Sequence, residues 1–346
     1  MKGVLLVNLG SPDSPSKSDV KKYLGEFLMD PRVIDLPYLL RAFLVKGVIL
    51  NTRPAKSAEA YSKVWTQEGS PLIVISEKLK SALSEKLSMP LSLGMRYGSM
   101  SIEKGLEELS LGGVTEVLIV PLYPQFAMST TETVMEKARE VKSAKFPGLS
   151  LDVLPPFYND SLYVEALAKS IEVGMKQNPE GHLLLSYHGV PERHIKKSDV
   201  TKSHCAINAV CCDEPSEAHE YCYRHQCLNT TKRIAEKLGL EKGMYTTAFQ
   251  SRLGRDKWLE PYAADTLESM PSKGIKNLNV VTPSFVADCL ETLEEMDIEN
   301  RELFTEAGGE RYNFIPCLND TTDFVNALES WCKSWQNENL RTYSIK

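Results

Sequence analysis

The stretch GVLLVNLGSP, residues 3–12, places a run of apolar residues directly before a glycine and a proline. The same order returns in HLLLSYHGVP, residues 182–191, and both stretches contain the pattern Leu-Leu-x-x-x-Gly-x-Pro. A short apolar run that ends at Gly and Pro is typical of a strand buried on both faces, as in a parallel sheet. The repeat indicates two related α/β halves, and a second, looser correspondence joins residues 117–126 to 278–285.

Outward from these two stretches, short apolar runs alternate with helical patterns. Apolar residues at three- and four-residue spacing predict helices, and Ser70 followed by Pro71 is typical of a helix start. Strands that alternate with helices predict a mainly parallel sheet covered by helices. The expected strands are 3–9, 91–95, 116–120, 151–155, 182–187, 245–249 and 278–282, and the expected helices include 72–87, 101–109, 161–177 and 229–238.

The length of 346 residues fits two domains of about 150 residues each. We expect an α/β protein with two Rossmann-like domains, each a parallel β-sheet flanked by helices. The first spans 1–158 and is completed by a C-terminal helix in 322–346, and the second spans 159–321. A formal charge of −6 disfavours a nucleic-acid-binding protein. Glycine-rich dinucleotide turns, P-loops and serine-hydrolase elbows are absent from the sequence.

The apolar runs are too short for targeting or membrane spanning. Residues 4–7 do not form the apolar core of a signal peptide. The longest apolar stretch, 36–50, contains Arg41 and Lys46 and is shorter than the roughly 20 residues of a membrane span. We therefore expect a cytoplasmic protein without a transmembrane segment, in a compartment where thiols stay reduced. The sequence leaves open a transient membrane contact and the oligomeric state.

The segment 191–228 is rich in Cys, His and charge and shows no convincing periodicity. We expect an insertion that something other than a hydrophobic core holds together. In a reducing compartment such crowding indicates metal ligation first, with a mixed Cys/His Zn²⁺ site or free thiols as alternatives. Five of the eight cysteines lie here, at positions Cys205, Cys211, Cys212, Cys222 and Cys227.

Ligands of open parallel sheets bind outside the carboxyl ends of the strands. Four polar segments that contain Pro or Gly follow predicted strands at that edge. Because the strands hold such loops rigid, we expect the four segments to face one cleft. They are NLGSPD (8–13), PLYPQF (121–126), SYHGVP (186–191) and TPSFVADCLETLEE (282–295).

Two of these segments carry titratable side chains. Gly189 follows His188 directly, so we expect the imidazole to be presented to a ligand. Neutral imidazole accepts a proton near pH 7 or binds a divalent metal, and a structural histidine is the alternative. After Phe285 we expect a helix on which Glu291, Glu295 and Glu299 share one face. That face serves a cation or a proton relay, or it is an ordinary solvated helix face.

Six motifs along nearly the whole chain are similar to those of the ferrochelatase family. The resemblance implies an enzyme, a lyase that inserts Fe²⁺ into protoporphyrin IX with release of two protons to form protohaem, the terminal step of haem biosynthesis. Coproporphyrin as the substrate, or a non-catalytic haem- or metal-binding protein, stay as alternatives. The motifs are NLGSPD (8–13), SPL (70–72), LYPQFAMST (122–130), SYHGVPER (186–193), FQSRLGRDKWLEPY (249–262) and ADCLETLEE (287–295).

The resemblance implies roles for individual residues. His188 and Glu291 match the family's histidine and acid, which face each other across the porphyrin cleft and bind the incoming metal or accept the pyrrole protons. Glu295 and Glu299 fit the acidic row behind that acid. Many relatives have a histidine two residues before the acid, where this chain has Cys289. We do not assign Cys289 as a ligand, because other bacterial members depart in the same way.

The resemblance also implies a substrate pocket. Arg53 and Lys56 stand where the family places basic residues near the porphyrin propionates. Residues 37–50 resemble the lip that closes over the macrocycle, with an amphipathic core helix as the alternative. Tyr123 and Trp258 are expected to line the pocket, although aromatic residues beside a strand also serve as core.

For the cysteines, the resemblance implies an iron–sulfur cluster. Bacterial relatives with extra cysteines in this region carry a 2Fe–2S cluster, which needs four thiolates. We expect Cys205, Cys212, Cys222 and Cys227 as ligands, with Cys212 chosen narrowly over Cys211. Such a cluster is expected to be structural or sensing, because metal insertion moves no electrons.

Overall fold

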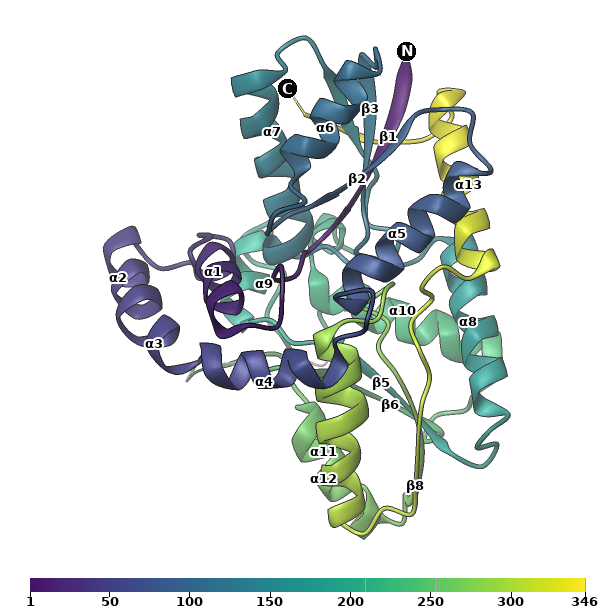
Figure 1. Cartoon of the computed structure of the whole chain (residues 1–346). Helices are drawn as coiled ribbons and strands as arrows, with labels where there is room; N and C mark the ends of the chain where they lie inside the picture. The colour runs from purple at the N-terminus through teal and green to yellow at the C-terminus, as the bar shows by residue number, and fades with distance from the viewer. Residues whose placement is uncertain (209, 253, 255, 346) are drawn as a thin grey trace. The chain divides into compact units, whose positions relative to one another are not determined.

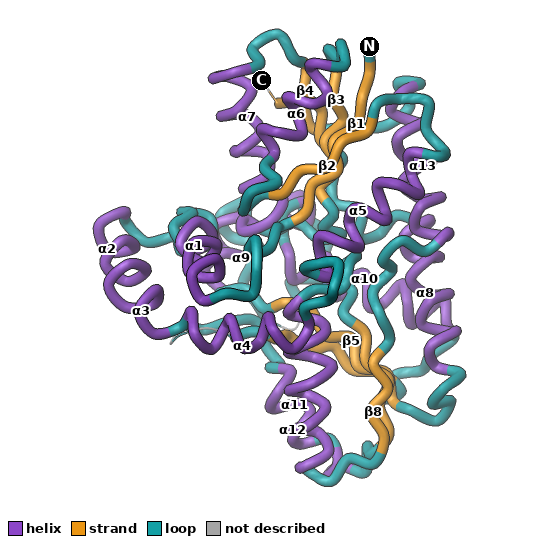
Figure 2. Tube along the Cα trace, in the orientation of Figure 1, coloured by secondary structure: helices purple, strands orange, loops and turns teal. Residues whose placement is uncertain are grey.

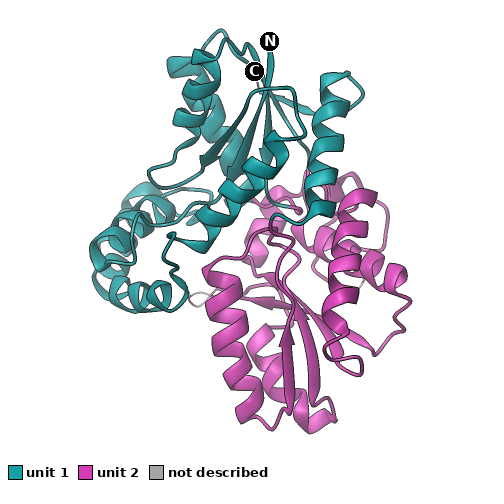
Figure 3. Cartoon of the chain, turned by 45° about the vertical axis from the view of Figure 1, so that its right-hand side comes forward, with its two compact units in different colours: residues 1–123, 128–155, 320–346 teal, residues 124–127, 156–319 magenta. Residues whose placement is uncertain are grey.

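The computed structural model describes residues 1–345 except 209, 253 and 255. Leu253 and Arg255, which belong to the 249–262 motif, lie outside the described residues. The chain divides into two compact units, coloured separately in Figure 3. Unit 1 comprises residues 1–123, 128–155 and 320–346, and unit 2 comprises residues 124–127 and 156–319.

Unit 1 is built on a sheet with strand order β2-β1-β3-β4-β9. The first four strands are parallel, and β9 pairs antiparallel with β4. The interior strand β1, between β2 and β3, carries the apolar run of residues 4–7, which is fully buried because helices cover the sheet. The bounds are β1 Lys2–Asn8, β2 Leu91–Met95, β3 Glu116–Pro121, β4 Ser150–Val153 and β9 Tyr343–Ile345.

Helices α5, α6 and α7 lie against this sheet, whereas α1 to α4 form a separate group beside it (Figures 1 and 2). Leu5 and Val7 of β1 pack with apolar residues of α6 and α7 in one core cluster. Helices α5 and α13 contact each other. The bounds are α1 Lys17–Leu28, α2 Tyr38–Ala42, η1 Phe43–Ile49, α3 Leu50–Thr52, α4 Pro54–Val64, α5 Pro71–Ser84, α6 Ile102–Leu111, η2 Met128–Glu132, α7 Thr133–Lys145 and α13 Thr322–Gln336.

Unit 2 is built on a fully parallel sheet with strand order β6-β5-β7-β8. Leu184 of β5 packs with residues of β7, α11 and α12 in a second core cluster. The strands are β5 His182–His188, β6 Tyr245–Gln250, β7 Asn277–Val281 and β8 Arg311–Phe314, and the helices are α8 Ser161–Met175, α9 Glu192–Ser198, η3 Glu217–Glu220, α10 Tyr223–Leu238, α11 Ala263–Ser269, η4 Pro271–Lys273, η5 Glu291–Glu299 and α12 Asn300–Glu306.

The two sheets share one topology, so the prediction of two related α/β halves is confirmed. Strands β2-β1-β3-β4 of unit 1 correspond in order to β6-β5-β7-β8 of unit 2. The repeated glycines follow β1 and β5, where another backbone passes close by. A Cβ on Gly10 would lie 1.9 Å from the Tyr97 carbonyl oxygen, and one on Gly189 would lie 2.8 Å from that of Gln250. Only glycine leaves room for this approach.

The seven expected strands are all present, but several details of the prediction were wrong. Strands β8 and β9 were not predicted, because they are short and mix polar with apolar residues. Segment 191–228 is not free of regular structure, since it contains α9 and the first turns of α10, which starts six residues before the expected Asn229. Polar residues such as Gln226 and Thr230 fill buried positions of α10 and mask its periodicity.

The apolar segment 37–50 forms α2 and the π-helix η1 and exposes large apolar side chains. Leu39 is 80% exposed and Phe43 is 72% exposed. An ordinary core helix, the alternative for this segment, would bury these side chains. Val45 of η1 is fully buried, so the segment still packs against the protein at that residue. Among the described residues, every helix is too short or too polar to cross a bilayer.

Candidate active site

His188 is the last residue of β5, and its neighbours fix its position closely. Its backbone N–H donates to the Ser284 hydroxyl at 3.0 Å, and its carbonyl accepts from the Tyr223 hydroxyl at 2.8 Å. The ring atom Nδ1 lies 2.6 Å from the Gly189 carbonyl oxygen. Because a carbonyl only accepts, Nδ1 carries the proton and Nε2 keeps a free lone pair. The half-buried imidazole is thus prepared to accept a proton or bind a metal.

The Glu295 carboxylate on η5 interacts electrostatically with this imidazole and with the neighbouring carboxylate of Glu291. Gln250, the register partner of His188 on β6, donates through Nε2 to the Glu291 carbonyl oxygen at 2.8 Å and to Glu295 Oε2 at 3.3 Å. Ser251 Oγ donates to the same carboxylate oxygen. Burial raises the pKa of Glu295, and the charge of Glu291 raises it further, while Ser251 and the charge of His188 oppose the rise. The structure therefore brings the imidazole and both carboxylates into one electrostatic group.

The acidic helix differs from the expected one in its start and its type. It begins at Leu290 rather than directly after Phe285, and residues 291–299 form a π-helix. π-helical turns are rare and occur often at functional sites. Glu299, at the far end, is exposed, whereas Glu291 and Glu295 are half-buried. The three carboxylates therefore do not share one environment.

Cys289 supports Glu291 through its thiol. Burial and the neighbouring carboxylate of Glu291 raise the pKa of Cys289 well above its usual range. The thiol thus stays protonated near neutral pH and hydrogen-bonds to Glu291. A thiol held in this form is a poor metal ligand, because the thiolate is the ligating species.

The expected pocket residues occur in both units. In unit 2, Trp258 is half-buried and lies against the backbone beside His188, since a Cβ on Gly189 would lie 3.2 Å from the Trp258 ring. In unit 1, Arg53 precedes α4 and Lys56 lies on its first turn, both exposed. Tyr123 is a buried member of the unit 1 core. The Tyr123 hydroxyl and the Trp258 indole N–H are buried without a hydrogen-bond partner among the described residues.

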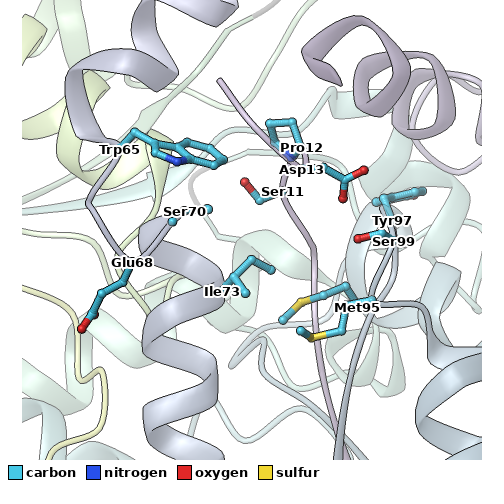
Figure 4. A pocket seen from close by; sticks show the side chains of 12 residues that line it. Ser11, Pro12, Asp13, Trp65, Glu68, Ser70, Ile73, Met95, Tyr97 and Ser99 are labelled. Atoms are coloured by element: carbon cyan, nitrogen blue, oxygen red, sulfur yellow. The ribbon is translucent and has the colours of Figure 1, made fainter. Parts of the chain in front are cut away.

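Unit 1 contains a pocket at the carboxyl edge of its sheet, shown in Figure 4. Trp65, Ser70 and Ile73 lie on one side of it and Tyr97 on the other, and its volume is about 210 Å³. The Ser11 hydroxyl lines it and is buried without a partner among the described residues. Ser70 is the N-cap of α5, yet its side chain makes no capping bond. Both hydroxyls are thus available to a polar ligand group.

The cysteine module, residues 204–227, brings four thiols together. Cys212 hydrogen-bonds through its thiol to Cys222, Cys222 bonds to Cys205, and Cys211 bonds to Cys212. Arg224 Nη1 lies 3.1 Å from Cys212 Sγ and 3.7 Å from Cys211 Sγ. Among the described residues, no three His, Cys, Asp or Glu side chains are placed to hold one metal ion.

Cys227 has different surroundings from the other four cysteines. It is fully buried, and its thiol contacts the Tyr223 hydroxyl. Burial raises its pKa well above the usual range of a thiol. The imidazoles of the module bind backbone carbonyls instead of facing the thiols: His204 Nε2 and His219 Nε2 donate to the Cys211 oxygen, and His225 Nδ1 donates to the Cys212 oxygen.

Three residues that fix this site were not predicted from the sequence. Gln250 donates to the Glu291 backbone carbonyl, and Ser251 donates to the Glu295 carboxylate. Ser284 accepts from the backbone N–H of His188. A signal was present, because all three are polar residues at the carboxyl end of a predicted strand. The sequence did not reveal which of the polar residues at that edge contact one another.

The fold is that of the chelatases. The structure resembles the sirohydrochlorin chelatase SirB from Bacillus subtilis subspecies spizizenii in complex with cobalt, with a TM-score of 0.55, 10% sequence identity, and coverage of 96% of this chain and 94% of that one. SirB from Bacillus subtilis with Fe³⁺ gives a TM-score of 0.52 at 13% identity, with the same coverage of both chains. These similarities show an α/β fold that is shared over nearly the whole chain.

The chain belongs to the ferrochelatase family. The family model described as Ferrochelatase matches residues 1–335. A ferrochelatase from Azotobacter vinelandii (strain DJ / ATCC BAA-1303) is 48% identical over 333 residues, which is 96% of this chain and 98% of that protein. A ferrochelatase from Pseudomonas aeruginosa (strain LESB58) is 49% identical over 326 residues, which is 94% of this chain and 95% of that protein.

Proposed function

We propose that the protein is a ferrochelatase that inserts Fe²⁺ into protoporphyrin IX and releases two protons to form protohaem, the terminal step of haem biosynthesis. The match to the family over residues 1–335 carries this proposal. The protein is then an enzyme, a lyase of the porphyrin metal chelatase type, with a porphyrin and Fe²⁺ as substrates. Relatives at 48% and 49% identity do not favour the coproporphyrin alternative.

The reaction sets a defined chemical problem. A free-base porphyrin is flat, and two of its four inward-pointing nitrogens hold weakly acidic protons. Both protons must leave as the metal arrives. Bending the ring lifts the lone pairs and N–H bonds out of plane, at an energetic cost that binding of the ring periphery offsets. The site therefore needs a base, a weak metal ligand and groups that grip the periphery.

We assign the base and transient ligand to His188. The bond from Nδ1 to the Gly189 carbonyl leaves the Nε2 lone pair free for a pyrrole proton or for Fe²⁺. Glu291 is the second proposed ligand, and Cys289 bonds to its carboxylate. Two protein ligands suit a metal that must leave, because the four ligands of a structural site would retain it.

We assign proton transfer to Glu295. Burial and nearby Glu291 raise its pKa, so it takes up a proton more readily than an exposed glutamate. Gln250 and Ser251 hold its carboxylate. A proton that His188 accepts from the porphyrin thus finds a carboxylate of raised basicity in the same electrostatic group.

The remaining proposed roles concern the porphyrin periphery. Exposed Arg53 and Lys56 are three positions apart at the start of α4 and offer two cations for the propionates. Tyr123 and Trp258 are proposed to line the pocket, and each has a buried polar atom without a partner among the described residues.

An anaerobic assay tests the activity. Purified protein is mixed with Fe²⁺ and protoporphyrin IX while the free-base absorption spectrum is followed. Repeated turnover with appearance of the protohaem spectrum supports the proposal. Stoichiometric porphyrin binding without metallation would favour the non-catalytic binding protein, and turnover of coproporphyrin alone would favour that alternative substrate.

We further propose that the cysteine module binds a 2Fe–2S cluster, and its donor set fits in two respects. Four thiols lie in one connected set of contacts, and thiolates are the ligands of such clusters. The four thiolates of such a cluster are divided between two irons, so they need not converge on a single point. When bound, the cluster supplies one-electron chemistry, which metal insertion does not use, so a structural or sensing role follows. The cytoplasm, our proposed location, keeps such thiols reduced.

The contacts favour Cys211 over Cys227 as the fourth ligand beside Cys205, Cys212 and Cys222. Iron and acid-labile sulfide content, with the visible absorption spectrum, distinguish the two sets. We expect Cys211→Ser to lose the cluster and Cys227→Ser to keep it. The reverse result restores the set that includes Cys227, and stoichiometric zinc without sulfide would replace the cluster by a zinc site.

A further inference from the structure

The first residue of α10 connects the cysteine module to the site around His188. Cys222 is the N-cap of this helix and Tyr223 follows it. The Tyr223 side chain is buried, and its hydroxyl donates to the His188 carbonyl oxygen at 2.8 Å. Burial raises the pKa of Tyr223 well above its usual range, so the hydroxyl remains a donor at physiological pH.

The His188–Gly189 peptide depends on this bond more than a peptide inside the sheet would. On the β6 side, the Gly189 N–H donates to the Gln250 carbonyl oxygen at 2.8 Å. On the β7 side, the strand pairing ends at Leu185 with Val281, three residues before His188. Hydroxyl groups from other segments therefore replace the missing strand at this end of β5.

Two hydroxyls do so, and they interact with each other. Ser284 accepts from the His188 N–H at 3.0 Å, and the hydroxyls of Ser284 and Tyr223 also form a hydrogen bond. Ser284 therefore binds the backbone N–H of His188, and Tyr223 binds its backbone carbonyl. The next carbonyl along, that of Gly189, accepts the Nδ1 proton and so orients the ring.

We infer that Tyr223 is a positioning residue: its hydroxyl fixes the His188–Gly189 peptide and thereby the direction in which Nε2 of His188 points. This inference rests on the proposed function, in which that nitrogen receives a pyrrole proton or the metal. Tyr223 does not touch the substrate in this role. Its loss lowers the rate of the chemical step rather than the affinity for porphyrin.

Tyr223→Phe removes the hydroxyl and keeps the ring. Tyr187→Phe is the matched control, because its fully buried hydroxyl lies 3.0 Å from the Thr231 hydroxyl on the same helix and does not bond to His188. We expect Tyr223→Phe to lower kcat about three- to tenfold with KM for porphyrin unchanged, the effect of one net hydrogen bond. Tyr187→Phe should keep the wild-type kcat at a similar loss of thermal stability.

A second variant guards against a trivial folding effect. Ser284→Ala removes the partner hydroxyl, and kcat of the double variant with Tyr223→Phe should fall by less than the product of the two single effects, because both hydroxyls hold one peptide. Equal kcat losses in Tyr223→Phe and Tyr187→Phe, a wild-type kcat in Tyr223→Phe, or independent effects in the double variant would overturn the inference. A wild-type protein without turnover would instead refute the proposed function.

Discussion

The imidazole of His188 is oriented by groups that are distant in sequence. Its ring bonds to the adjacent Gly189 carbonyl, while Ser284 and Tyr223 bind its backbone from two other segments. A side chain fixed in this way approaches its reactive geometry before the substrate binds. In the proposed function, this preorganisation lowers the entropic cost of the chemical step.

His188→Ala should abolish measurable metallation and leave the fold intact. A positioned general base contributes about 10²- to 10⁴-fold in rate, and this variant also removes the proposed metal ligand. The assay is loss of the free-base porphyrin spectrum, with thermal unfolding as the check on folding. The control is His182→Ala at the other end of β5, whose ring lies 2.8 Å from the Thr246 hydroxyl. A full rate in His188→Ala would remove this residue from the mechanism.

Glu295 should give the protein a measurable pH dependence of stability. Burial raises its pKa, so the folded chain keeps this proton to higher pH than the unfolded chain does. The free energy of unfolding therefore falls as the pH rises from 4.5, the ordinary pKa of a glutamate, through the raised pKa of Glu295 in the folded state. Glu295→Gln has no such proton. Its free energy of unfolding, measured with urea, should therefore fall less over the same pH range. The exposed Glu299→Gln should keep the wild-type slope, and an unchanged slope in Glu295→Gln contradicts the assignment.

Among the elements, the parallel strands fix the ends at which the polar loops begin. In unit 1, the loop that follows α1 is tied to β2 and α7 through the buried carboxylate of Asp30. It accepts hydrogen bonds from Arg96 at 2.5 Å, from the Tyr97 hydroxyl at 3.0 Å and from the Thr133 hydroxyl. Burial by itself would raise the pKa of Asp30, but these bonds and the Arg96 charge lower it.

Asp30→Asn should destabilise the protein by about 3 kcal/mol, because it leaves the half-buried Arg96 charge without its carboxylate partner. Folding lowers the pKa of Asp30 below its ordinary value of 3.8. Its contribution to the free energy of unfolding is therefore present above pH 3.8 and is lost as the pH falls through the lowered pKa of the folded state. Urea unfolding at stepwise lower pH measures both effects. Glu140→Gln, in an exposed pair with Lys137, is the control and should change stability by less than about 0.5 kcal/mol. An Asp30→Asn variant as stable as this control would refute the role of the network.

Gly189→Ala tests the close approach between the end of β5 and β6. The added Cβ would lie 2.8 Å from the Gln250 carbonyl oxygen, so one backbone must move and shift His188 with it. We expect a loss of about 1–3 kcal/mol in stability and a lower kcat. Gly148→Ala, where no atom lies within 4 Å of the added carbon, is the control and should change neither. Wild-type activity in Gly189→Ala would show that this peptide need not be fixed.

For the molecule as a whole, one strand order serves two different purposes. Unit 2 places the imidazole and the carboxylates at the carboxyl edge of its sheet, whereas unit 1 places a pocket with two available hydroxyls at the corresponding edge. The net charge of −6 opposes an acidic porphyrin at long range, so local cations must compensate. Arg53 and Lys56 are the proposed cations.

Arg53→Gln and Lys56→Gln should each raise KM for protoporphyrin about three- to tenfold and leave kcat nearly unchanged. An ion pair to a propionate binds the ground state and the transition state alike, so its loss weakens binding only. Steady-state kinetics at low and high salt measure the effect, which should shrink as salt screens the charges. Lys137→Gln is the exposed control on α7, and a KM equal to that of this control would contradict the propionate role.

Much of the fold could be predicted, because apolar runs of strand length and helical spacing record which faces are buried. All seven expected strands formed, and the repeated Gly marked equivalent positions in both halves. Strands β8 and β9 were missed, since edge strands need less apolar sequence than central ones. The start of α10 was missed because buried Gln and Thr residues hide its pattern.

The sequence by itself determined the α/β class, the mainly parallel sheets and the edge at which His188 and Glu291 stand, because these depend on periodic burial and on strand direction. Tertiary structure alone decided that Glu291 and Glu295 lie on a π-helix beside Gln250, that Tyr223 bonds to the His188 carbonyl, and that the Cys227 thiol contacts the Tyr223 hydroxyl. The contact of Tyr223 with His188 joins residues 35 positions apart, and that of Gln250 with Glu295 joins residues 45 positions apart. Periodicity does not encode which polar groups meet.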